Sequence, residues 1–69
     1  MVLTAVIAPA EEGGYTAFNP ETGTISEGES IEAAIANLKE ATSLYLEEFP
    51  LGRPRQALLT TFELESSHA

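Results

Sequence analysis

The spacing of apolar residues changes its period once along this chain, and that change most constrains the fold. Up to Glu27 the apolar residues form short runs in which they either alternate with polar residues or follow one another directly, as in β-strands. From Ser30 the period becomes about 3.6 residues, and the pattern continues without glycine or proline to Phe49. Short strands directly before one long amphipathic helix leave a 69-residue chain few ways to fold.

Three strands separated by turn signals are expected before the helix. The first is rich in Val, Ile, Leu and Thr, and both of its alternating faces are largely apolar, which predicts a central strand. After Pro9, the Gly13-Gly14 pair supplies the positive-φ freedom of a tight reversal, and Pro20 with Gly23 marks a second turn. The predicted strands are residues 2–8, 15–18 and 24–27.

The helix is predicted over residues 30–49. Ser30 suits the N-cap position, Glu29 and Glu32 lie where the helix dipole favours negative charge, and Pro50 disfavours helical geometry at the residue before it. The apolar positions are spaced four and three residues apart and form one stripe, which is expected to anchor the helix on the sheet. Its members are Ile31, Ile35, Leu38, Thr42, Tyr45 and Phe49.

The sequence after the helix predicts a connection over residues 50–56, a last strand over 57–65 and a tail over 66–69. Phe62 of the last strand is expected to be a core anchor. We therefore expect one α+β domain, residues 1–69, of order β-β-β-α-β. A right-handed crossover would place the last strand beside the first, giving a four-stranded sheet of order 3-2-1-4 with the helix on one face. The other face would expose Val2, Val6 and either Tyr15 or Phe18.

Composition limits what such a domain does. A chain this short has a thin core. It has no Cys to form a disulfide, and His68 is its one His, so a metal site is not plausible. Self-association or a partner is therefore expected to stabilise it. Eleven Glu against three basic residues give a net charge of -8, which opposes nucleic-acid binding and favours a basic protein partner. No cofactor, membrane span or secretory signal is expected, and the cytoplasm is the expected location.

Several short motifs occur in an order that suggests a family. They are Gly13-Gly14-Tyr15, the turn at Pro20, Gly28-Glu29-Ser30, Glu32-Ala33-Ala34, the run from Ala36 to Ala41, and Thr60-Thr61-Phe62-Glu63. In this order and spacing they resemble the HicB family of type II antitoxins, over about Ala5 to Glu47 and again near the end. The resemblance implies a partial ribonuclease H-like fold. It also implies a partner, a small basic HicA-like ribonuclease toxin.

Two departures from the family pattern bear on function. The reciprocal Glu of a capping box is missing, because Ala33 stands at the third helical position after Ser30. Many family members also continue into a DNA-binding domain, whereas this sequence stops at Ala69, so a short form without operator binding is expected.

The leading hypothesis is an antitoxin-type binding module that masks the RNA-binding or catalytic surface of such a toxin. The residues predicted to contact it are Glu11, Glu12, Tyr15, Phe18, Glu21 and Glu27. Solvated turn residues are an equally good interpretation of Glu11 and Glu12. The alternative function is an orphan domain that forms homodimers or higher homo-oligomers through its bare sheet face. Catalysis is not expected, because the first strand carries no acid for a metal-dependent nuclease.

Overall fold

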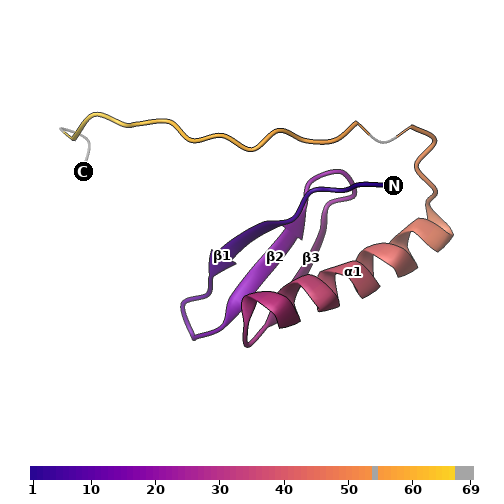
Figure 1. Ribbon diagram of the computed structural model, residues 1–69, viewed down its shortest axis with the longest axis horizontal. Helices are drawn as coiled ribbons and strands as arrows, with labels where there is room; N and C mark the ends of the chain where they lie inside the picture. The colour runs from indigo at the N-terminus through magenta and orange to yellow at the C-terminus, as the bar shows by residue number, and fades with distance from the viewer. Residues whose placement is uncertain (54, 67–69) are drawn as a thin grey trace.

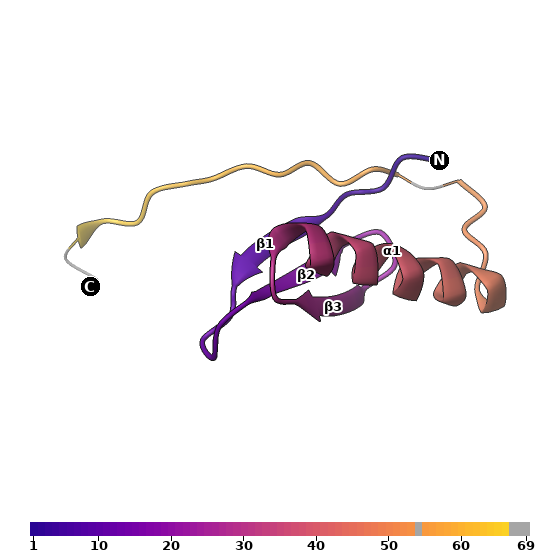
Figure 2. The same ribbon diagram turned by 60° about the horizontal axis from the view of Figure 1, so that its bottom comes forward.

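The computed structural model describes residues 1–53 and 55–66, and it contains three strands followed by one helix (Figure 1). The strands are β1 (Val6–Pro9), β2 (Tyr15–Asn19) and β3 (Thr24–Gly28), and the helix is α1 (Ile31–Glu48). β2 is central and pairs antiparallel with both neighbours, so the sheet order is β1-β2-β3. The helix lies across one face of the sheet (Figure 2). No helix of the described residues has the length and apolarity of a membrane span.

The predicted four-stranded sheet of order 3-2-1-4 is wrong. Residues 57–65 form no strand and extend past the sheet without lying against it (Figure 1). Their alternating pattern marks a segment able to join a β-ladder, but a ladder also requires the segment to meet a strand edge. β1 is consequently an edge strand, not a central one, and the segment is exposed. Of the predicted tail, only Ser66 lies within the described residues, and His68 lies outside them.

The other predicted elements lie close to the observed ones. The first strand begins at Val6 and not at residue 2, because its ladder with β2 ends at the Val6–Phe18 pair. β2 and β3 each extend one residue beyond their predicted ends, and α1 is one residue shorter than predicted at each end. Ser30 caps the helix, accepting a hydrogen bond at its Oγ from the Ala33 N–H at 3.0 Å.

The core is small and is built from small side chains. Ala17 of β2 and Ala34 of α1 are fully buried, Leu38 is nearly so, and Ile7 and Tyr15 pack against them. The helix lies so close to the sheet that a Cβ added at Gly28 would stand 2.3 Å from the Ala34 backbone nitrogen. This short separation explains why alanines fill the closest part of the helix–sheet interface, while Leu38 of the predicted stripe is buried beside them.

Several predicted anchors lie outside this core. Ile31, Ile35, Phe49 and Phe62 are all exposed, while the buried positions of the helix are Ala34, Leu38 and Thr42. The sheet is only three short strands wide, so it covers a narrow strip of the helix. Tyr45 is half-buried and its ring contacts that of Phe49, with the ring centroids 5.1 Å apart.

A buried polar network closes the end of the sheet at the β2–β3 turn. Asn19 is almost completely buried, and its Nδ2 donates to the Thr4 carbonyl at 2.8 Å, while its Oδ1 accepts from the Thr22 N–H at 2.9 Å. The hydroxyls of Thr22, Thr24 and Thr42 continue the network at 2.8 and 2.7 Å and tie the turn to the helix. Among the residues that the structure describes, no buried side-chain nitrogen or oxygen lacks a hydrogen-bond partner, as burial of polar atoms requires.

Candidate functional site

The β1–β2 turn projects two carboxylates from one end of the sheet. The Ala10 N–H donates to the Gly14 carbonyl at 3.0 Å, and Gly13 and Gly14 have positive φ angles of 102° and 74°. Such angles strain residues that carry a Cβ, so the Gly-Gly pair allows a turn this tight. Glu11 and Glu12 occupy the outside of the turn and are exposed.

The end of β3 brings further acidic residues to the same place. Glu27 pairs across the strands with Thr16, and Glu29 follows the strand directly before the helix. A Cβ added at Gly14 would stand 2.7 Å from the Gly28 carbonyl oxygen, so the turn lies directly against the end of β3. Two acidic segments separated in sequence are therefore neighbours in space.

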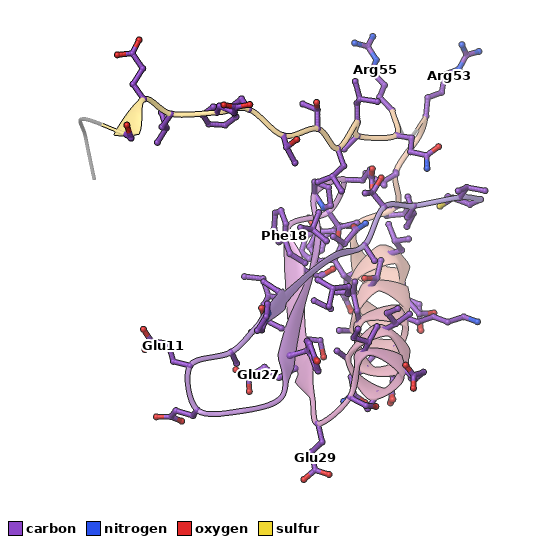
Figure 3. The ribbon with its side chains drawn as sticks, turned by 60° about the vertical axis from the view of Figure 1, so that its left-hand side comes forward. Glu11, Phe18, Glu27, Glu29, Arg53 and Arg55 are labelled. Carbon is purple, nitrogen blue, oxygen red and sulfur yellow. The ribbon has the colours of Figure 1, made fainter. Side chains whose placement is uncertain are left out.

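Together these segments surround an open hollow of about 830 Å³, which we call the acidic hollow. Its lining includes four glutamates, and Figure 3 shows Glu11, Glu27 and Glu29 at this end of the molecule. The residues of the acidic hollow are Ala10, Glu11, Glu12, Gly13, Gly14, Tyr15, Thr16, Glu27, Gly28 and Glu29.

The charges of the domain are unevenly distributed. Arg53 and Arg55 lie at the end of the molecule opposite the acidic hollow (Figure 3). Clustered carboxylates with no cation nearby produce a negative potential that attracts basic groups and raises their local concentration. Within residues 1–53 and 55–66, no group of three or more His, Cys, Asp or Glu side chains is arranged to hold a metal ion. The clustered carboxylates of the acidic hollow suit it to the recognition of positive charge.

The structure brings together four of the six predicted contact residues. Glu11, Glu12, Tyr15 and Glu27 all line the acidic hollow, although the Tyr15 ring packs partly against the core. Glu29 was predicted only as a residue near the helix start, and the structure adds it to the site. The signal for it was present, because Gly28-Glu29-Ser30 and Gly13-Gly14-Tyr15 are both motifs of the resemblance and both border the acidic hollow.

Phe18 lies elsewhere, on the sheet face that the helix leaves bare. It pairs with Val6 on one side and with Ile25 on the other, so the three residues form one apolar row across the sheet. Phe18 and Ile25 are exposed. The outward aromatic residue of β2 is thus Phe18, while Tyr15 faces the helix.

Glu21 acts as a structural clamp and does not lie in the acidic hollow. Its Oε2 accepts from the Ala57 N–H at 2.6 Å, and its Oε1 accepts from the Thr4 N–H at 2.8 Å. The Thr4 hydroxyl and the Asn19 amide also donate to it, at 2.7 and 2.6 Å. One carboxylate therefore joins the N-terminal segment, the β2–β3 turn and the segment after the helix.

We predict that acid detaches this clamp. Hydrogen bonds from the Ala57 and Thr4 N–H groups, assisted by the Thr4 hydroxyl and the Asn19 amide, lower the pKa of Glu21 to about 2 against the opposing effect of desolvation. Because the pKa falls on folding, the stabilisation is complete above the ordinary carboxyl pKa of 4.5 and is lost as pH decreases toward 2.

Carbon NMR of the Glu21 carboxyl measures this directly. We expect its midpoint near pH 2, accompanied by a shift of the Ala57 amide, and a midpoint near 4.5 in urea. A native midpoint equal to the urea value would show that the clamp does not form in solution.

These features define a small acidic domain of β-β-β-α order with a glutamate-lined hollow at one end. The chain belongs to the UPF0150 family. It is 42% identical to a UPF0150 protein of Synechocystis sp. over 64 residues, which cover 86% of this chain and 89% of that protein. It is 49% identical to a UPF0150 protein of Helicobacter pylori over 47 residues, 67% of this chain and 64% of that protein. These names state no activity or partner. No protein-family model and no solved structure match the chain.

Proposed function

We propose that this domain is a HicB-like antitoxin module that binds and neutralises a small basic ribonuclease of the HicA type. The observation that carries the proposal is the acidic hollow, where two motifs of the family resemblance meet and which four glutamates line. A protein that binds RNA must present basic residues, and the same residues are attracted to a cluster of carboxylates. A toxin held in this way is unable to use that surface for RNA.

The net charge supports a protein partner over nucleic acid. At -8, with Arg53 and Arg55 at the end away from the acidic hollow, the domain repels phosphate groups where its carboxylates cluster. The domain thus competes with RNA for the toxin and does not bind RNA itself. We extend this to catalysis: the domain binds and performs no chemistry.

Coexpression with a basic HicA-like protein encoded by the adjacent reading frame tests the proposal. We expect a stable complex, and we expect ribonuclease activity to disappear when this chain is in stoichiometric excess. The chain alone, incubated with RNA and Mg²⁺, serves as the control and should leave the RNA intact. A toxin that remains active in excess of this chain would disprove the antitoxin function, and the orphan homo-oligomer would then be the better interpretation.

A further inference from the structure

The segment after the helix is an extended arm with apolar side chains in solvent. We call residues 55–66 the arm; it runs past the sheet as an extended segment and continues beyond it (Figures 1, 2 and 3). Its large apolar side chains are Leu58, Leu59, Phe62 and Leu64, exposed by 90%, 67%, 83% and 77%. Its central part, residues 57–62, carries no charge. A contiguous apolar segment of this kind marks an interaction surface.

Each chain also has a strand edge suited to receive such an arm. In an antiparallel ladder the N–H and C=O groups of alternate residues point toward the partner strand. In and around β1 these are the even-numbered residues: the Ala10 N–H donates to the Gly14 carbonyl, and the Thr4 carbonyl accepts from the Asn19 side chain. The peptide groups of Ile7 therefore point outward from the edge. Unpaired outward groups on an edge strand are a template for another strand.

An apolar groove lies beside the N-terminal segment that leads into this edge. It has a volume of about 480 Å³ and lies between the N-terminal segment and α1. Apolar side chains predominate in its lining, among them Leu3, Ala5, Ile35 and Leu38. A strand added along the β1 edge and continuing beside the N-terminal segment would project alternate side chains toward this groove and would cover the exposed Ile35.

The chain's own arm does not use this edge. The Glu21 clamp holds it at Ala57, where the Thr4 hydroxyl also contacts the Ala57 carbonyl at 3.3 Å. Beyond that residue the arm leaves the sheet, and no ladder forms between it and β1. Each chain thus carries one unpaired arm and one open edge with its groove.

We infer that the arm of one chain pairs with the β1 edge of a second copy and inserts apolar side chains into that copy's groove, while the second copy does the same in return. A two-fold arrangement uses both arms and both edges and leaves neither exposed. A basic protein fits the arm less well, because the central part of the arm is uncharged and the carboxylates that attract cations lie in the acidic hollow. This interchain pairing is independent of the antitoxin proposal.

Sedimentation equilibrium of the full chain tests the association. We expect a dimer at micromolar concentration that becomes tighter as salt increases, because each copy carries a charge of -8. The double variant Leu58→Ser and Phe62→Ser should weaken the dimer by about 100-fold or more, since two apolar side chains are lost from each of two arms. Leu44→Ser is the matched control, because Leu44 is also exposed, by 58%, but lies on the helix, and it should leave the dimer unchanged.

Cross-linking identifies the surfaces that pair. The chain has no cysteine, so Ala5→Cys chains mixed with Thr60→Cys chains report only on the introduced thiols. A short bismaleimide should join the two, and should not join Glu40→Cys chains to Thr60→Cys chains. A monomer that cross-links internally when both cysteines are in one chain would overturn the inference. So would a dimer whose arms do not cross-link to β1, or arms that cross-link only to an added basic toxin.

Discussion

Replacing Gly28 with alanine should lower the free energy of unfolding by about 3 kcal/mol, the upper end of the usual cost of overpacking. The added Cβ would stand 2.3 Å from Ala34 N, 2.6 Å from Ala33 C and 2.8 Å from Ala34 Cα. All three are backbone atoms of the helix, so no side chain is able to rotate out of the way. The helix must move off the sheet, and the core of Ala17, Ala34 and Leu38 opens with it.

Urea unfolding followed by circular dichroism measures this change. Gly52→Ala is the matched control, because a Cβ at Gly52 meets nothing within 4 Å and its φ is not positive. A loss of about 3 kcal/mol is a large part of the stability of a small domain, so the Gly28 variant should be partly unfolded even in buffer. Equal unfolding midpoints for the two variants would contradict the close helix–sheet approach.

Neutralising the acidic hollow should weaken binding of a basic partner by about 100-fold at low salt, mainly by slowing association. The variant changes all four glutamates of the site to glutamine, namely Glu11, Glu12, Glu27 and Glu29. Glutamine preserves the size of the side chain and one acceptor oxygen, so the loss mainly reports the charge. The difference from the unmodified chain should diminish at high salt, because screening removes the attraction that the variant lacks.

Binding to a purified basic HicA-like protein, measured by surface plasmon resonance at several salt concentrations, provides the rates. The matched control changes four glutamates of the helix to glutamine, namely Glu32, Glu40, Glu47 and Glu48, and produces the same net charge. We expect the helix variant to bind nearly as well as the unmodified chain. If both variants weaken binding equally, total charge governs the interaction and the acidic hollow has no particular role.

The local elements of this fold were predictable because each follows from neighbouring residues. The change of period at Ser30 and the Gly13-Gly14 turn place β2, β3 and α1 almost where they occur. Residues 57–65 show the limit of this reasoning. Alternation describes a segment that suits a sheet, but it does not specify which edge the segment meets, or in which chain.

The errors in the core and the site have related causes. Periodicity identified the apolar stripe of the helix but not the distance to the sheet, and the close approach at Gly28 makes alanine the residue that fits. Asn19 was predicted only as part of a turn and Glu21 as a toxin contact, because their hydrogen bonds to Thr4 join segments separated by at least 15 positions. Glu29 was missed although its motif was recognised, because only the fold shows that this motif lies beside the Gly13-Gly14 turn.

The placement of the two arginines and the acidic hollow at opposite ends has a consequence for encounters in solution. Four carboxylates gather in the acidic hollow, and the arginines that could offset them lie at the other end, so negative potential is concentrated at the turn end (Figure 3). When a positively charged protein approaches, the electrostatic field exerts a torque on the domain before contact. This torque rotates the domain so that the β1–β2 turn faces the approaching protein. Collisions with the wrong orientation are thereby converted into productive ones without any change in the contacts finally made.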